Sequence, residues 1–138
     1  MQFTAAIVAF AAASVASASA VFKASDFSAS CIPHSAQCVY EFGIIQAGNG
    51  ETIPVKCRAQ VVSDGSLPEI TDGTCEESSR TFTVAKADGG LVLTVTQPVT
   101  PSSNQSGKHT IPASELEVEQ TGASSQQKYI GAAAFDLE

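Results

Sequence analysis

Short segments of this chain alternate apolar and polar side chains, and this period of two is the feature that most restricts its fold. The alternation is clear over residues 37–46 and 53–62. The positions that it places on the inward face are Cys38, Tyr40, Phe42, Ile44, Val55, Cys57, Ala59 and Val61. Such alternation is typical of β-strands with one buried face. After residue 20, no window of a dozen residues carries a helical apolar stripe free of Pro and Gly, so we expect little or no helix.

Two further strands form the clearest predicted hairpin. Residues 80–86 and 91–97 alternate in the same way, and the Asp-Gly-Gly sequence at 88–90 favours a tight turn. A last strand is expected along residues 129–137, with alternate side chains on one face. Residues 98–107 are rich in Pro, Ser, Asn and Gln, which predicts a surface loop. Short strands joined by turns predict an all-β domain, either a small antiparallel β-barrel or a β-sandwich.

The first twenty residues, MQFTAAIVAFAAASVASASA, have the layout of a secretory signal peptide. They carry no charged side chain, an apolar stretch over 5–15, and small residues at 16, 18 and 20. A transmembrane anchor needs about 20 consecutive apolar residues, and serines interrupt this run. The small residues fit cleavage after residue 18 or after residue 20. We therefore expect a signal peptide over 1–20, a single β domain over 21–138, secretion, and no stable insertion into a membrane.

The domain contains four cysteines, Cys31, Cys38, Cys57 and Cys75. An even number of cysteines in a small secreted domain predicts two disulfides. The short separations favour the pairs Cys31–Cys38 and Cys57–Cys75. The pair Cys38–Cys57 is the competing interpretation, since both side chains are predicted to face inward. Zinc sites typically use closely spaced cysteine pairs, and none occurs here, so we expect no metal.

Charge restricts the partners of the domain. The 14 acidic and 7 basic side chains give a net charge of −7, the wrong sign for a surface that binds nucleic-acid phosphates. We therefore expect no nucleic acid as a partner. Only 15% of the residues are charged and 43% are hydrophobic, a balance that excludes a disordered acidic tail. We expect a globular monomer or a weak homo-oligomer.

Residues that could carry catalysis are few. The two histidines, His34 and His109, lie beside Pro or Gly in turn-like settings, and no Gly-x-Ser-x-Gly motif supports a serine hydrolase. Glu115, Glu117 and Glu119 would share one face of a strand, where carboxylates can bind calcium or act as an acid and a base. We favour a solvated charged edge, which resists pairing with strands of other molecules. No catalytic, cofactor-binding or metal-binding residue is therefore predicted.

Aromatic side chains on the predicted inward faces allow two interpretations. These side chains are Tyr40, Phe42, Phe82, Tyr129 and Phe135. Small β-barrels sometimes hold a ligand among such side chains, which would make the domain an extracellular binding module for a small hydrophobic molecule. In a domain of about 120 residues we favour a core that these side chains fill.

The segment around residue 104 is the predicted recognition surface, because loops on a rigid β scaffold are where partners usually bind. The predicted contact residues are Val99, Ser102, Asn104, Gln105 and Lys108. Asn104-Gln105-Ser106 also matches the acceptor pattern for N-glycosylation, which predicts Asn104 as a modified residue. The competing interpretation is a solvated connection without a partner. Residues 48–51 and 64–73 are then the next loops to consider.

Seven segments spread over residues 27–138 look like those of one known group of proteins. They are FSASCIPHS (27–35), CVY (38–40), PVKC (54–57), LPEITDGTC (67–75), SRTF (79–82), QPVTPSSNQ (97–105) and AFDLE (134–138). With these residues the chain resembles the hypersensitive-response-inducing secreted proteins of plant-pathogenic fungi. Those proteins are in turn similar to the β-barrel of the major fungal allergen family, whose members are secreted, disulfide-bonded and without a settled enzymatic activity.

The resemblance implies a protein elicitor or effector that is released into the apoplast. The host plant perceives such a protein and responds with defence-gene induction and hypersensitive cell death. The implied partner is a host plant surface or apoplastic protein, and neither an enzymatic activity nor a cofactor is implied. Only the four cysteines transfer residue by residue to this sequence. The alternatives are the extracellular ligand-binding module and a passive cell-wall-associated protein.

Overall fold

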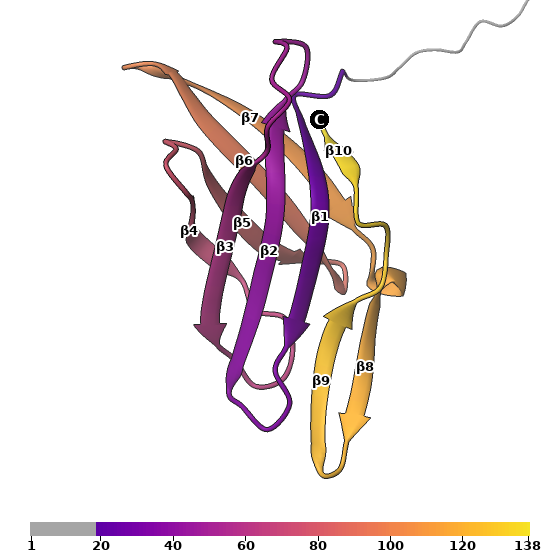
Figure 1. The fold of residues 1–138 in the computed structure, drawn as a ribbon. Coiled ribbons are helices and arrows are strands. Elements are labelled where there is room, and N and C mark those ends of the chain that lie inside the picture. The colour runs from indigo at the N-terminus through magenta and orange to yellow at the C-terminus, as the bar shows by residue number, and fades with distance from the viewer. Residues whose placement is uncertain (1–18) are drawn as a thin grey trace, which may run out of the picture.

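The computed structural model describes residues 19–138, so the predicted signal peptide lies outside the described residues except for its last two positions. Ten strands make up the fold (Figure 1). They are β1 (Phe22–Cys31), β2 (Gln37–Gln46), β3 (Val55–Val62), β4 (Ile70–Cys75), β5 (Thr81–Ala87), β6 (Gly90–Thr100), β7 (Ser103–Ile111), β8 (Leu116–Thr121), β9 (Ser124–Tyr129) and β10 (Phe135–Leu137). A 3₁₀ turn, Ala113–Glu115, precedes β8, and residues 19–138 contain no α-helix. The predicted all-β class is confirmed.

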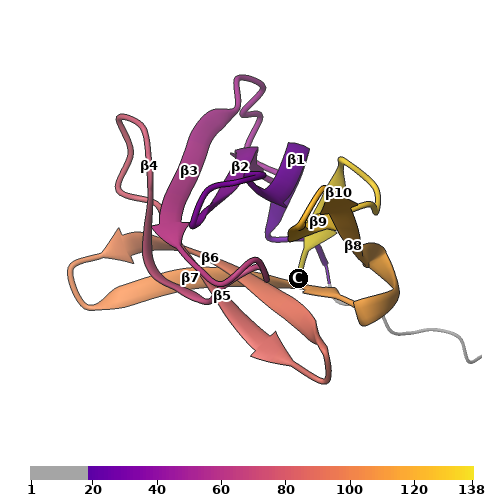
Figure 2. The ribbon, with the colours of Figure 1, turned by 90° about the horizontal axis from the view of Figure 1, so that it is seen from below.

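The strands form one curled antiparallel sheet. Their order is β7-β6-β5-β4-β3-β2-β1-β9-β8, and β10 pairs with the start of β1. Figure 2 shows the curl, in which β1, β2 and β3 face β5, β6 and β7 across the interior. β10 reaches the far edge of the sheet, because the backbone N–H of Glu138 donates to the carbonyl of Lys108 in β7 at 2.8 Å. The result is a barrel-like antiparallel sheet, as the sequence predicts.

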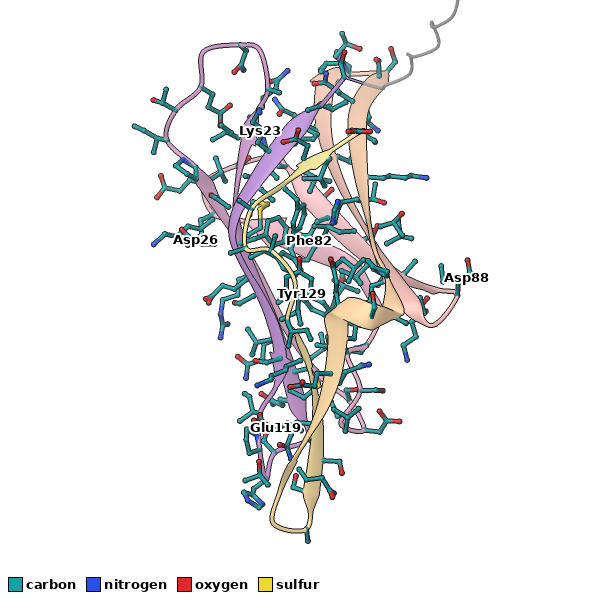
Figure 3. The ribbon with its side chains drawn as sticks, turned by 90° about the vertical axis from the view of Figure 1, so that its right-hand side faces the viewer. Lys23, Asp26, Phe82, Asp88, Glu119 and Tyr129 are labelled. Atoms are coloured by element: carbon teal, nitrogen blue, oxygen red, sulfur yellow. A yellow bond between two sulfur atoms is a disulfide. The ribbon has the colours of Figure 1, made fainter. Side chains whose placement is uncertain are left out.

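The concave face of the sheet encloses one apolar core. Phe27, Phe42 and Phe82 are almost fully buried, and the Phe42 ring lies 5.7 Å from Phe27 and 4.9 Å from Phe82. Tyr129 and Phe135 pack edge-on against Phe27 at 4.9 and 5.2 Å. Figure 3 shows Phe82 and Tyr129 inside the curl. Of the aromatic side chains predicted to face inward, Phe42 and Phe82 therefore lie in the core, and Tyr129 and Phe135 are partly buried against it. Tyr40 is fully buried, and its hydroxyl donates to the carbonyl of Pro68 at 2.7 Å.

Both disulfides join residues that lie directly opposite each other on neighbouring strands. Cys31 in β1 is bonded to Cys38 in β2, and Cys57 in β3 is bonded to Cys75 in β4. The pairing predicted from the short separations is confirmed, and the alternative pair Cys38–Cys57 does not form. All four side chains belong to the buried core, so each disulfide fixes the register of two strands from the inside.

A β-bulge in β1 hides the alternation of this strand in the sequence. The register with β2 shifts between Ser25 and Ser28, and Asp26 takes a left-handed φ of 52°. The shift moves the inward positions from even residues, such as Ala24, to odd residues, such as Phe27. The bulge thus keeps one face of β1 in the core along the whole strand.

The predicted surface loop over 98–107 is wrong. β6 runs to Thr100 and β7 starts at Ser103, so the segment forms the end of a long hairpin. β6 pairs with β5 only as far as Thr96, and beyond it has a neighbouring strand on one side only. Pro is tolerated at such edge positions, which explains how Pro98 can belong to a strand.

The predicted last strand over 129–137 is also wrong, because the structure divides it in two. β9 ends at Tyr129 and β10 spans only Phe135–Leu137. The chain bends between them at Gly131, where an added Cβ would lie within 2.7 Å of both the Tyr129 hydroxyl and the Glu115 carboxylate. A larger residue at this position would push these two side chains aside.

Candidate functional site

The predicted recognition residues lie on the β6–β7 hairpin, which projects from the upper end of the sheet (Figure 1). Val99, Ser102 and Asn104 are exposed near the hairpin tip, and Lys108 is exposed further along β7. Asn104, the predicted glycosylation site, is therefore in contact with solvent. Gln105 is half-buried. The hairpin thus exposes four of the five predicted residues and keeps the fifth partly covered.

A buried arginine lies at the centre of the upper end. The Arg80 side chain is only 7% exposed and precedes β5. Its guanidinium donates to the two carboxylate oxygens of Glu51 at 2.7 and 2.8 Å and to Gln97 Oε1 at 2.7 Å. It also lies 5.7 Å from the centre of the Phe22 ring. The hydrogen bonds from Arg80 hold the pKa of Glu51 below its ordinary value. Arg80 therefore ties the β2–β3 connection to β6.

Side-chain amides extend this network to the β6–β7 hairpin. Gln46 Nε2, at the end of β2, donates to Gln105 Oε1 at 3.0 Å, and Asn49 Nδ2 donates to Gln46 Oε1 at 3.0 Å. Asn49 Oδ1 accepts a bond from the backbone N–H of Glu51 at 2.9 Å. The β2–β3 connection and the β6–β7 hairpin, separate recognition candidates in the sequence, are therefore fastened together. We refer to residues 48–51 and 98–104 together as the upper rim.

Sequence reasoning missed this network, because its partners are far apart in the chain. Arg80 and Glu51 are separated by 29 residues, and Gln46 and Gln105 by 59. One signal was available. Arg80 lies two residues before the inward-facing Phe82, so the alternation of β5 places its side chain on the same, buried face. A charged side chain on a buried face needs a partner of opposite charge.

The prediction that His109 lies in a turn is wrong. His109 belongs to β7, opposite Leu93, and its ring stacks on Phe135 with 3.8 Å between the ring centres. Burial lowers the pKa of His109, although the nearby carboxylate of Glu115 acts in the opposite direction. The imidazole thus helps to hold the short strand β10 against β7.

The second histidine and the predicted glutamate group lie near the β8–β9 hairpin. His34 lies in an exposed turn with a φ of 59°, and its backbone N–H is 3.5 Å from Ser124 Oγ in β9. Glu117 and Glu119 lie on β8, an edge of the sheet, with carboxylate oxygens 3.9 and 3.4 Å from the Lys128 ammonium. Glu115 lies in the preceding 3₁₀ turn instead. The structure therefore places two of the three glutamates on a strand edge.

A hollow of about 340 Å³ lies beside the β5–β6 turn, at the other end of the sheet from the upper rim. Leu67, Leu91 and Leu116 line it together with the polar residues Lys86 and Gln127. Leu67 and Leu91 are almost fully buried, so little of their apolar surface faces the opening. The hollow therefore offers a small hydrophobic ligand little apolar contact.

Comparison with known proteins adds no relative to this description. No protein-family model, no curated protein and no solved structure matches the chain. Between residues 19 and 138, no group of three or more His, Cys, Asp or Glu side chains is arranged to hold a metal ion. The same part of the chain has no helix with the length and apolar character needed to cross a membrane.

Proposed function

We propose that this chain is a secreted fungal protein elicitor that triggers host plant defence and hypersensitive cell death through recognition of its surface, without catalysis. The resemblance of its segments to the hypersensitive-response-inducing proteins supports the proposal. The two disulfides are consistent with an oxidising extracellular environment, and the leader sequence supports secretion. The proposed partner is a host plant surface or apoplastic protein.

The observation that carries the proposal is the construction of the upper rim. Its two segments are held by the bond of Glu51 to Arg80 and, just outside the rim, by the bond of Gln46 to Gln105. A loop whose conformation is already fixed loses less entropy when it binds a partner. Val99 is 52% exposed among polar neighbours and offers such a partner an apolar contact. A fixed surface of this mixed character suits recognition by another protein.

Several titratable side chains are already held by contacts within the fold, which supports a role in recognition rather than in catalysis. The His109 ring is stacked on an aromatic ring, and the Glu51 carboxylate is bonded to a guanidinium. The Tyr129 hydroxyl donates to the carbonyl of Ala132 at 2.6 Å. Each of these groups has a role in holding the fold, which favours a structural use over an acid–base one.

Leaf infiltration tests the proposed function. The purified mature protein with intact disulfides is compared with the same preparation after reduction and alkylation. We expect localised cell death from the folded protein alone, because the upper rim depends on contacts between distant segments. Equal cell death from both preparations would show that a linear peptide is perceived. No response to the folded protein in any host would contradict elicitor activity.

A further inference from the structure

A groove of about 590 Å³ crosses the outer face of β1, β2 and β3, outside the core. Gly43 in β2 and Lys56 in β3, which lie directly opposite each other, line it, and Ser25 in β1 pairs with Gly43 on the other side. Gly43 lets Pro54 pack closely over β2, because a Cβ added at Gly43 would lie 2.9 Å from the Pro54 Cβ. Ile53 stands next to Pro54 on the wall and is 80% exposed. The groove is therefore built by a glycine beneath the returning β2–β3 connection.

Acidic side chains mark the two ends of the groove. The bulge in β1 carries Asp26, which Figure 3 shows on the outside of the sheet. Glu76 follows β4 at the other end, and its backbone N–H donates to the carbonyl of Lys56 at 2.7 Å. Both side chains are exposed, and neither forms a salt bridge within residues 19–138. Arg58, by contrast, is paired with Glu41 at 3.2 Å. Two carboxylates thus remain available to an external partner.

We infer that this groove binds an extended peptide segment of a partner protein, with a basic side chain at each end and an apolar side chain between them. The basic side chains would meet the carboxylates of Asp26 and Glu76. The apolar side chain would cover Ile53, whose exposed surface otherwise stays in contact with water. This inference does not depend on elicitor activity, because it concerns binding alone.

The dimensions of the sheet set the spacing of the basic residues in the partner. β1 and β4 are three strand intervals apart, which is about 14 Å at the usual strand spacing. An extended peptide rises about 3.4 Å per residue, so basic residues four positions apart span this distance. Residues two positions apart in an extended peptide point to the same side. The pattern that fits is therefore Lys-x-Leu-x-Lys.

Electrostatics favours a basic partner over an acidic one. The net charge of −7 attracts a basic segment from a distance, and the two free carboxylates then hold it at the groove. Two basic residues also line the groove, Arg58 and Lys56. Arg58 is paired with Glu41, whereas Lys56 forms no salt bridge within residues 19–138. Removal of this ammonium should therefore strengthen binding.

Fluorescence anisotropy with a labelled Ser-Lys-Ser-Leu-Ser-Lys-Ser peptide tests the inference at low ionic strength. We expect Asp26→Asn/Glu76→Gln to weaken binding about tenfold. The control Asp88→Asn/Glu119→Gln removes the same charge away from the groove, and Asp88 has a φ of 50° like Asp26. Asn tolerates this backbone conformation, so both double variants should keep the melting temperature of the native domain. We expect the control to bind as the unaltered protein does, and Lys56→Gln to bind more tightly.

Three results would overturn the inference. The first is no binding of the peptide by the unaltered domain. The second is equal weakening in the groove variant and in the control, which would mean that net charge alone attracts the peptide. The third is unchanged or weaker binding by Lys56→Gln. The assay contains no plant tissue, so its outcome is separate from the outcome of leaf infiltration.

Discussion

Arg80 forms a two-point ion pair with Glu51 of the upper rim, with N–O distances of 2.7 and 2.8 Å. The Arg80 side chain is 7% exposed and that of Glu51 is 21% exposed. The pair therefore lies mostly out of water, and the carboxylate is the compensating charge of the guanidinium. It also fixes the β2–β3 connection against the rest of the sheet.

Loss of this carboxylate should destabilise the domain more than loss of an exposed one. Glu51→Ala leaves the buried guanidinium of Arg80 without its counter-charge, and we expect the free energy of unfolding to fall by about 3 kcal/mol. Glu41→Ala, the control, removes the partner of Arg58 in a pair that is more than half exposed, and should cost less than about 1 kcal/mol. Urea titration measures both. Equal losses would contradict a stabilising role specific to the buried pair.

The same pair should make the free energy of unfolding depend on pH in the acidic range. The pKa of Glu51 in the folded protein lies below its ordinary value of 4.5, chiefly because Arg80 bonds the ionised carboxylate. Its contribution is therefore present above pH 4.5 and is lost as the pH falls through the folded pKa. We expect Glu51→Gln to reduce the loss of unfolding free energy on acidification in this window. Parallel curves for the variant and the native protein would contradict the assignment.

His109 should make the free energy of unfolding depend on pH in a higher range. Its pKa in the folded protein is lowered from 6.5, chiefly by burial. The unfolded chain therefore takes up a proton before the folded one, and stability should fall as the pH drops below 6.5. His109→Phe keeps an aromatic ring against Phe135 and removes the titration. Urea titrations between pH 7 and pH 5 should show a smaller decrease for this variant, and an equal decrease would exclude His109 as the source.

β10 should contribute to stability far more than its length indicates. Leu137 is fully buried where this strand reaches β7, so Leu137→Ala should cost about 3 kcal/mol in the free energy of unfolding. Val118→Ala removes methyl groups from a side chain that is 64% exposed and should be close to neutral. Thermal and urea unfolding measure both changes. A neutral Leu137→Ala would mean that β10 does not close the core.

The alternation of apolar and polar residues predicted a strand correctly where it continues without a break along the strand. β2 has the predicted bounds, 37–46, because its inward positions from Cys38 to Ile44 follow one parity. β1 was missed because the bulge at Asp26 changes the parity within the strand. The segment around Pro98 was misassigned because its composition suits a loop, whereas pairing with β7 holds it extended.

The candidate site was less predictable than the strands. Exposure of Asn104 follows from local composition, but the bonds that fasten the upper rim do not. Gln46 and Gln105 become neighbours only after the sheet curls, and no sequence period of two or three relates them. The same is true of Arg80 and Glu51, although the inward parity of Arg80 indicates that it needs a partner.

Recognition through the upper rim is tested most directly by the cell-death dose of a rim variant in infiltrated leaves. Val99→Ser/Ser102→Lys changes two exposed rim residues outside the Arg80 network, and Ala87→Ser/Asp88→Asn makes the same change in net charge at two exposed residues of the β5–β6 turn. We predict that the rim variant needs a dose about tenfold higher, while the control keeps full potency and both keep the native melting temperature. Full potency of the rim variant would contradict recognition at this surface.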